Sequence, residues 1–308
     1  ARKISKPYVP GALRGGTHRH EWSGDGNWIG FTYNDVILKQ LEGTTGEIHN
    51  LRTIGVSNNC GAVIIEESQD GEDFSGSWFS VIVVRVVANP VPGSDEISRA
   101  AGDSWVGKSG YRKPDGTLQR ARSFIGTTKN NTGADVDEVY IVDIPEDITI
   151  PGPYGPLEGT DTSMPAPPAN TKQRRLTFTS DSSFPGCQGV VRSNTDGSLL
   201  AFIAKDDKGV KQLFTISPLG GTMQQITFSE KPIQGNFRWH PFRNELCYIA
   251  DGSLFMQELG KKPRRLTLQT AEPPTDIVWS HDGKTIAFNR LVTDNAGRVA
   301  KQIFIIRL

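Results

Sequence analysis

Two histidines near the start of the chain, His18 and His20, are the side chains whose type and spacing most directly suggest chemistry. Because they lie two positions apart on an expected strand, both imidazoles project from one face, which is a workable spacing for two ligands of one metal ion. No third histidine is expected to reach them, so carboxylates from elsewhere in the fold would have to complete the site. A divalent ion, Mn or Ca, is therefore the one cofactor that the sequence suggests.

The strands that must position these histidines belong to a repeated unit. The pattern Trp-Ser-x-Asp-Gly followed by an apolar strand occurs at residues 22–26 and again at 279–283. Short runs of Val, Ile, Phe and Tyr separated by Gly, Asp, Asn and Pro recur throughout, while helical periodicity is almost absent. Segments resembling Arg-Arg-Leu-Thr begin at residues 174, 224 and 264, with spacings close to the roughly 40 to 45 residues of a four-stranded propeller blade. The sequence thus predicts an all-β fold, a β-propeller of four-stranded antiparallel blades.

About five blades are visible, and we expect one β-propeller domain over residues 1–308. An apparent insert, 89–118, interrupts the second blade, and a Pro-rich loop, 145–171, joins that blade's third strand to its fourth. The last blade stops after its third strand, and the opening residues contain no Leu-Thr strand to complete it. We therefore expect part of a ring that lacks its N-terminal blades, because a closed propeller leaves no such edge exposed. The predicted blades are 10–58, 61–178, 185–229, 234–268 and 274–308.

These repeats resemble those of TolB-type β-propellers, whose consensus is a Trp-Ser-Pro-Asp-Gly turn with a Leu-Thr outer strand. The segment Pro-Gly-Ser-Asp-Glu-Ile at 92–97, with Trp105 and Gly107 downstream, is similar to a group of uncharacterised bacterial TolB-like proteins. The resemblance implies two further blades upstream, a seven-bladed ring, and a periplasmic location. It extends distantly to the oligogalacturonate lyases, in which histidines and a glutamine hold a metal ion, although Gly15 stands where that glutamine is expected.

Alignment of the repeats distinguishes the two histidines. When the first strands are aligned on Trp22, Ser193, Trp239 and Trp279, His20 falls on an otherwise apolar position and is expected to pack between blades. His18 falls at the start of the strand, where the other repeats have Gly or Thr and solvent can reach. His18 is therefore the stronger candidate for a functional role.

The expected strand order also sorts the loops into two faces. Connections from strand one to two and from three to four share a bottom face, while connections from two to three and between blades share a top face. Long loops and charged residues gather on the top face, which makes the channel mouth there the candidate site. Solvated turns are an equally simple explanation, and a hairpin loop accounts for the paired aspartates. The candidate ligand-binding residues are Arg14, His18, Trp105, Arg112, Asp206, Asp207 and Arg290.

Composition narrows the classes of partner. Lys plus Arg and Asp plus Glu both number 34, so no overall field favours nucleic acid and no nucleic-acid partner is expected. The longest apolar run, 81–88, is far shorter than the ~20 residues of a membrane-spanning helix, so no span is predicted. Cys60, Cys187 and Cys247 are widely separated, and we expect them to be buried small side chains.

The absence of a complete catalytic set shapes the functional hypothesis. No nucleophile elbow, phosphate-binding loop or dinucleotide-binding motif occurs in the sequence. The leading hypothesis is a non-catalytic TolB-like propeller that binds a protein partner or a glycan-like ligand, an oligosaccharide, at the channel mouth. A metal-assisted polysaccharide lyase of the oligogalacturonate type is the alternative, and an assembly platform is the third possibility.

Overall fold

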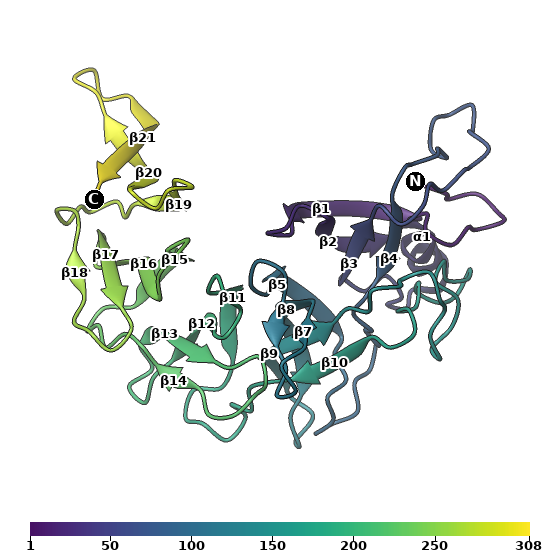
Figure 1. The fold of residues 1–308 in the computed structure, drawn as a ribbon, viewed down its shortest axis with the longest axis horizontal. Helices are drawn as coiled ribbons and strands as arrows, with labels where there is room; N and C mark the ends of the chain where they lie inside the picture. Colours follow the sequence, from purple (N-terminus) through teal and green to yellow (C-terminus); the bar gives the residue numbers. More distant parts are fainter.

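Antiparallel sheets follow one another along the chain in the computed structural model, which describes residues 1–308. Figure 1 shows the sheets side by side in an open arc, with the two termini toward its two ends and the first strand of each sheet toward its inside. The fold is therefore all-β with four-stranded antiparallel sheets, as predicted. We use the term inner strands for the first strands, which are β1 (Gly15–Trp22), β5 (Arg99–Trp105), β11 (Cys187–Ser193), β15 (Ile233–Trp239) and β19 (Thr275–Trp279).

The remaining strands complete each sheet outward from its inner strand. The first sheet adds β2 (Trp28–Asp35), β3 (Thr53–Asn58) and β4 (Phe79–Ile82), and the second adds β8 (Ala121–Lys129), β9 (Asp135–Asp143) and β10 (Lys172–Arg175). The third adds β12 (Leu200–Lys205), β13 (Lys211–Ile216) and β14 (Gln224–Gln225), and the fourth adds β16 (Glu245–Ala250), β17 (Ser253–Glu258) and β18 (Arg264–Arg265). The last sheet has three strands, adding β20 (Thr285–Thr293) and β21 (Val299–Arg307).

The Trp-Ser-x-Asp-Gly unit forms the same turn in both copies. In the first, the Ser23 hydroxyl donates to the Asp25 carboxylate at 2.6 Å and accepts from the backbone N–H of Trp28 at 3.0 Å. In the second, the Ser280 hydroxyl makes the corresponding contacts with Asp282 at 2.6 Å and Thr285 at 3.0 Å. Side-chain bonds of this kind hold the backbone in a tight turn. The repeated motif therefore encodes the connection from the first to the second strand.

Every inner strand contains a β-bulge whose first residue has a positive φ. Opposite each bulge the second strand carries an aromatic ring, and in four of the sheets this ring stacks on an aromatic side chain of the third strand, as between Phe202 and Phe214 at 6.2 Å. Such bulges bend a strand and redirect its side chains. The positive-φ residues are Arg19, Gly102, Gly189, Gly235 and Asp276, and the opposing rings are Phe31, Phe124, Phe202, Tyr248 and Phe288.

The apolar cores lie between neighbouring sheets. One cluster joins the first and second sheets through Ile54, Val56 and Phe124, and another joins the second and third through Val139 and Val191. Further clusters repeat this arrangement up to the last sheet. Because each sheet is stabilised mainly by burial against its neighbours, the inner strands are held at fixed positions along the arc.

Two predicted blade boundaries are wrong. The first sheet does not end at residue 58, because its fourth strand is β4, after the long connection 59–78. The inner strand of the second sheet is β5, which lies inside the range predicted as an insert, 89–118. The sequence of β5, Arg-Ala-Ala-Gly-Asp-Ser-Trp, has no β-branched residue and contains a bulge at Gly102, so its composition does not indicate a strand.

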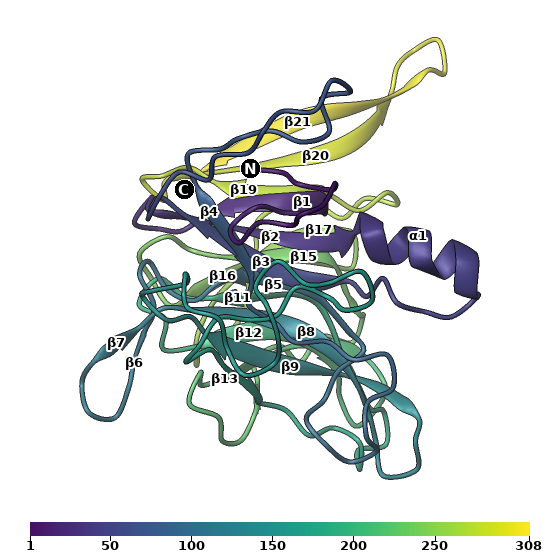
Figure 2. The same ribbon diagram turned by 90° about the vertical axis from the view of Figure 1, so that its right-hand side faces the viewer.

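One helix, α1 (Val36–Thr45), was not predicted and connects β2 to β3. Asp35 caps its start by accepting a hydrogen bond from the Leu38 N–H at 3.0 Å, and Gly46 ends it with a φ of 74°. No helix of the structure has the length and apolar character needed to cross a membrane. Figure 2 shows α1 on one side of the molecule and the small hairpin of β6 (Tyr111–Arg112) and β7 (Leu118–Gln119) on the opposite side.

Candidate functional site

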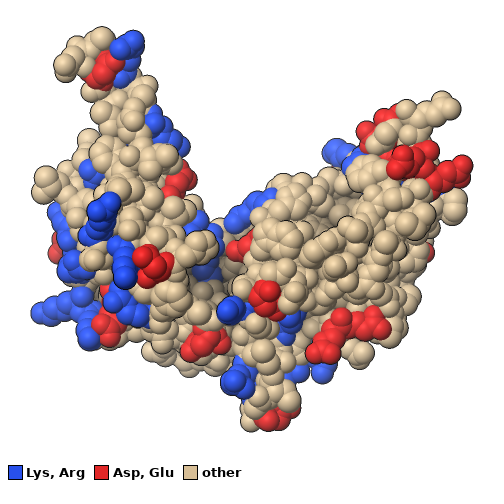
Figure 3. Space-filling view, turned by 45° about the horizontal axis from the view of Figure 1, so that its top comes forward, with Lys and Arg blue, Asp and Glu red and all other residues tan.

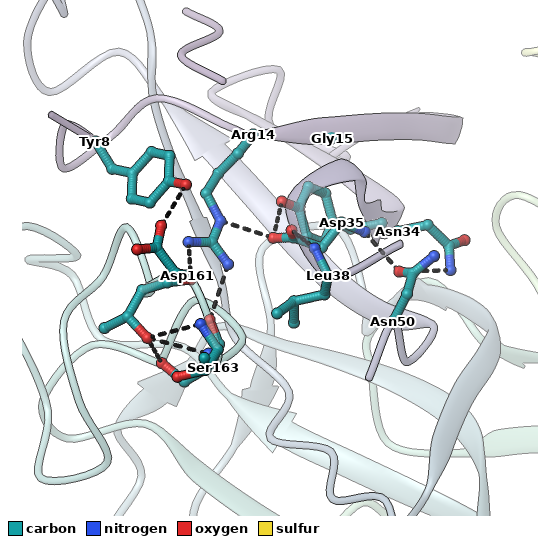
Figure 4. A network of polar contacts seen from close by, with 12 residues as sticks. Tyr8, Arg14, Gly15, Asn34, Asp35, Leu38, Asn50, Asp161 and Ser163 are labelled. Atoms are coloured by element: carbon teal, nitrogen blue, oxygen red, sulfur yellow. Dashed lines mark hydrogen bonds and ion pairs between the residues drawn. The ribbon is translucent and has the colours of Figure 1, made fainter. Parts of the chain in front are cut away.

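Arg14, a predicted ligand-binding residue, is fully buried in a network of polar contacts (Figure 4). Its Nε donates to the Asp35 carboxylate at 2.8 Å, and its two terminal nitrogens donate to the backbone oxygens of Thr160 at 2.6 Å and Ser163 at 2.8 Å. With every nitrogen bonded inside the protein, Arg14 has none free for a ligand. The contacts of Arg14 are therefore structural, and they do not support its predicted role in ligand binding.

The same network shows where the Pro-rich loop lies. Thr160 and Ser163 belong to this loop, and their contacts with Arg14 bring the middle of the loop to the start of β1. Asp161 of the loop also accepts from Lys6 at 2.5 Å and from the Tyr8 hydroxyl at 2.9 Å. The loop therefore fastens the second sheet to the first along the outside of the arc.

His18 is half-buried against a permanent positive charge. Its Nε2 lies at hydrogen-bonding distance from the guanidinium of Arg52, and its backbone oxygen accepts from the Thr32 hydroxyl at 3.0 Å. Burial and the nearby charges of Arg52 and Arg19 lower the pKa of His18 below its ordinary value. A neutral imidazole accepts from Arg52 through the same lone pair that a metal ion would need.

His20 is exposed, contrary to the prediction that it packs between blades. Its Nε2 pairs with the Thr17 hydroxyl at 2.9 Å. In β15 and β19 the equivalent residues, Phe237 and Ile277, are buried against the preceding sheet. His20 is exposed because no sheet among residues 1–308 precedes the first one.

The two histidines do not form a metal site in this structure. The bulge at Arg19, with a φ of 56°, breaks the alternation that would place both rings on one face. No group of three His, Cys, Asp or Glu side chains has an arrangement that could hold a metal ion. The guanidinium of Arg52 beside His18 also disfavours a cation. The residues present therefore do not fit the suggested Mn or Ca ion.

The predicted pair of Trp105 and Arg112 is not part of the top face. Trp105 is buried at the end of β5, where its indole N–H donates to the backbone oxygen of Glu21 at 2.9 Å. Arg112 is exposed on the β6–β7 hairpin, within the connection from the first to the second strand and so at the bottom. Trp105 joins two sheets, and Arg112 lies on the opposite face from His18.

Asp206, Asp207 and Arg290 occupy local structural positions. The Asp206 carboxylate accepts from the N–H groups of Lys208 at 3.0 Å and Val210 at 2.9 Å, so it closes the hairpin loop as the simpler alternative predicted. Asp207 is exposed beside it. Arg290 donates to Thr267 at 3.0 Å and to the backbone oxygen of Leu268 at 3.1 Å. Of the predicted binding residues, only His18 lies beside the charged surface described next.

Five arginines from four sheets form a basic surface along the inner strands. None of the five forms an ion pair with a carboxylate. Figure 3 shows Lys and Arg side chains within the hollow between the two arms of the arc. We call this set the inner arginine surface, and it consists of Arg19, Arg52, Arg99, Arg192 and Arg238.

The electrostatics of this surface reflect the proximity of like charges. Burial and then the neighbouring charge of Arg238 lower the pKa of Arg192 to about 10. Burial and then Arg99 and Arg19 lower the pKa of Arg52. Arg19 contributes to the lowered pKa of Arg52, Arg192 and Arg238, so it lies near all three. These guanidinium groups repel one another, and a bound anion would relieve the repulsion.

The carboxylates of the same region already form ion pairs within the protein. The buried guanidinium of Arg122 forms an ion pair with Asp103 and a second one, at 3.4 Å, with Glu21. Glu21 also accepts from the backbone N–H of Trp105 at 3.2 Å. The carboxylates therefore neutralise Arg122, while the inner arginine surface keeps its charge.

Sequence reasoning missed this surface because its members are far apart along the chain. The equal numbers of basic and acidic residues in the whole chain do not reveal arginines that gather only in the folded protein. A usable signal existed in the repeats, since Arg192 and Arg238 both directly precede the alignment positions Ser193 and Trp239. Side chains at this position of the inner strand face the hollow, and a comparison of that one position across the repeats would have found the pair.

Solved structures with similar folds are TolB-type and other β-propeller proteins. TolB from Acinetobacter baumannii is 14% identical with a TM-score of 0.43, covering 95% of this chain and 52% of that one, so this chain spans about half of its length. The β-propeller domain of the Trilobed protease from Pyrococcus furiosus, described as having an open velcro topology, is 9% identical with a TM-score of 0.44, covering 95% of this chain and 68% of that one.

Sequence comparison identifies a closer relative. A family model described as a protein of unknown function (DUF3748) matches residues 1–72. The uncharacterised protein YidR of Escherichia coli (strain K12) is 37% identical over 297 residues, which cover 94% of this chain and 68% of YidR. The chain therefore belongs to the same protein family as E. coli YidR.

Proposed function

We propose that the protein is a non-catalytic propeller that binds an acidic partner on its inner arginine surface. The observation that carries the proposal is the convergence of five arginines from four sheets, none of which has a carboxylate partner. Guanidinium groups without a carboxylate partner are well suited to bind carboxylates, because their forked N–H groups match carboxylate geometry.

Binding without catalysis is supported by the surroundings of His18. A general base needs a free lone pair near its substrate, whereas Nε2 of His18 faces the guanidinium of Arg52. The metal-assisted lyase loses its support as well, because the side chains around His18 and His20 do not fit a metal ion. The geometry thus favours a scaffold that holds a ligand by charge.

An acidic polypeptide segment is the favoured ligand within this proposal. Trp105 and Arg112, both predicted to bind the ligand, would together offer an aromatic face and a cation to a sugar or a peptide. Trp105 is buried and Arg112 lies on the opposite face, so that combination does not exist at the top of the channel. Acidic side chains of a flexible segment could instead reach several arginines at once along the hollow.

We also propose that further sheets complete the ring, as the predicted seven blades require. His20 and Trp22, which is 59% exposed, occupy positions that are covered by a preceding sheet elsewhere in the arc. At the other end, β21 exposes Ile303 at 76% and Ile305 at 60%. A chain extended with its upstream sequence should protect Trp22 from an aqueous fluorescence quencher, and continued quenching of Trp22 would contradict ring completion.

The periplasmic location implied by the TolB resemblance remains a proposal. It rests on that resemblance. Fractionation of native cells, followed by detection of the protein beside known periplasmic and cytoplasmic markers, would test it. Recovery with the cytoplasmic marker would overturn it.

Binding of a fluorescent oligoglutamate peptide, followed by anisotropy, tests the proposed function. We expect saturable binding by the wild-type protein and at least about tenfold weaker binding by the Arg19→Gln/Arg99→Gln double variant. Both residues are exposed and unpaired, so their replacement should leave the fold intact. Arg264→Gln, an exposed arginine on β18, is the matched control. Equal affinity in all three proteins would overturn the proposal.

A parallel titration distinguishes an oligosaccharide ligand and a lyase activity from the proposed binding of an acidic polypeptide. Labelled oligogalacturonate replaces the peptide, and its tighter, arginine-dependent binding would favour the oligosaccharide over the polypeptide. Accumulation of an unsaturated sugar product in the same mixture, abolished by His18→Ala, would contradict the non-catalytic role and favour the lyase.

A further inference from the structure

A cavity of about 350 Å³ lies where the inner strands of four sheets end. Its walls combine Glu21 of β1, Ser104 of β5, Arg192 of β11 and Arg238 of β15. The indoles of Trp22, Trp105 and Trp239 form apolar parts of the wall. The cavity therefore lies at the bottom end of the inner arginine surface.

Two of the lining side chains, Arg192 and Arg238, form no ion pair within the protein. Both are partly buried, and neither has a carboxylate oxygen within 4.0 Å. The only side-chain hydrogen bond of Arg238 goes to the backbone oxygen of Phe237 at 3.0 Å, and Arg192 makes none. Partly desolvated guanidinium groups without partners destabilise a fold unless a ligand compensates them.

Glu21, the acidic residue of the cavity wall, acts on Arg192 and Arg238 only from a distance and forms no ion pair with either. Its carboxylate pairs with Arg122 at 3.4 Å and accepts from the Trp105 N–H at 3.2 Å. The exposed ammonium of Lys108 adds a further positive charge at the rim. The cavity therefore combines three cations with one carboxylate that is already bonded elsewhere.

We propose that this cavity binds one oxyanion group, a carboxylate or a phosphate, between the guanidinium groups of Arg192 and Arg238. The inference deepens the proposed function and rests on it, because it assigns a discrete anchoring site within the inner arginine surface. The group is carried either by a small free anion or by an acidic side chain of a bound polypeptide. The indole walls would contact the apolar part of either ligand.

Thermal unfolding at constant ionic strength tests the site with inorganic phosphate and succinate as probes, and chloride as the reference anion. Each probe should raise the Tm of the wild-type protein and of Arg264→Gln in a saturable manner. The shift should disappear in Arg192→Gln and shrink in Arg238→Lys, which keeps the charge but loses the fork. A wild-type Tm that does not respond to either probe would overturn the site.

A second measurement covers the case in which a variant fails to fold. Without added anion, Arg192→Gln should be at least as stable as the wild-type protein, since it removes a guanidinium charge that has no ion-pair partner. A clear loss of stability would contradict the proposal.

Oligoglutamate binding distinguishes a small free anion from an acidic side chain as the source of the bound group. It also distinguishes the anchoring site from the proposed function. If succinate displaces the oligoglutamate peptide, an acidic side chain of the peptide occupies the cavity. Oligoglutamate binding that depends on Arg19 and Arg99 but not on Arg192 overturns the anchoring site while leaving the proposed function intact.

Discussion

The indole N–H of Trp239 donates a hydrogen bond to the backbone oxygen of Arg192 at 2.8 Å. The donor belongs to the fourth sheet and the acceptor to the third, so this bond joins two inner strands at the wall of the cavity. Trp105 and Glu21 repeat it between the second and first sheets at 2.9 Å. The same contact that holds neighbouring sheets together therefore also fixes Arg192 beside Arg238.

Replacement of Trp239 by Phe tests this bond. Trp239→Phe should lower the free energy of unfolding by about 1 kcal/mol, the usual net value of one hydrogen bond, plus a small packing term. Trp279→Phe is the matched control, because the indole N–H of Trp279 has no hydrogen-bond partner. Urea denaturation measures both variants, and an equal loss in the two would show that the bond to Arg192 contributes nothing.

The buried pair of Arg14 and Asp35 should be among the most sensitive positions of the fold. Both side chains are completely buried and 2.8 Å apart, so Arg14→Met leaves an uncompensated carboxylate and should cost about 3–5 kcal/mol. Lys261→Ala, which breaks an exposed pair with Glu258, should cost about 0–1 kcal/mol. Denaturant titration compares them, and similar small losses would refute the structural role assigned to Arg14.

Stability should fall as the pH drops below neutrality because of His240. Its Nδ1 accepts from the Phe242 N–H at 3.0 Å, and burial, followed by the charge of Arg243, lowers its pKa below the ordinary value. Since the unfolded chain then binds a proton more readily than the folded one, the free energy of unfolding decreases as pH falls from about 7 through 6.5, the ordinary histidine pKa.

His240→Asn isolates this contribution. Asparagine keeps an acceptor for the Phe242 N–H but cannot titrate. The variant should therefore lose less of its own stability between pH 7 and pH 5 than the wild-type protein does. Identical pH profiles would assign the dependence to other groups, of which His18, with its lowered pKa, is the next to examine.

The three cysteines should differ sharply in reactivity. Cys60 is exposed, in contrast to the expectation from sequence, whereas Cys187 and Cys247 are buried. Burial raises the pKa of Cys247 to about 12, so its thiolate is scarce at pH 8. A thiol reagent should modify Cys60 rapidly in the native protein and the other two only after denaturation. Rapid native labelling of Cys187 or Cys247 would be inconsistent with the packing between the sheets.

Much of the fold could be predicted from sequence because its turns are closed by hydrogen bonds between residues that are close together in the chain. The Ser23 and Asp25 side chains close their turn through bonds within a few residues, and Ser280 and Asp282 repeat it. Strand β5 escaped prediction for the opposite reason, since its pairing with β8 depends on partners far along the chain. Its last residue, Trp105, is equivalent to Trp239 and was the available signal.

The candidate site was harder to predict than the fold. Arg14 is charged and precedes a strand, yet only tertiary contacts with the distant residues Thr160 and Ser163 show that it is buried. His20 was placed at the right position of the repeat, but its exposure depends on whether another sheet covers it. The arginines of the inner surface come together only when four sheets are arranged around one axis, which no local pattern specifies.

A charge-swap measurement tests the central claim most directly. In the Arg19→Glu/Arg99→Glu variant, two positive charges at the inner arginine surface become negative while the unpaired Arg264 remains unchanged. We expect this variant to lose binding of the labelled oligoglutamate peptide and to acquire binding of an oligolysine peptide of equal length, with both effects weakening at high salt. Retained oligoglutamate affinity without any gain for oligolysine would contradict the claim that the inner arginine surface is where the protein binds its partner.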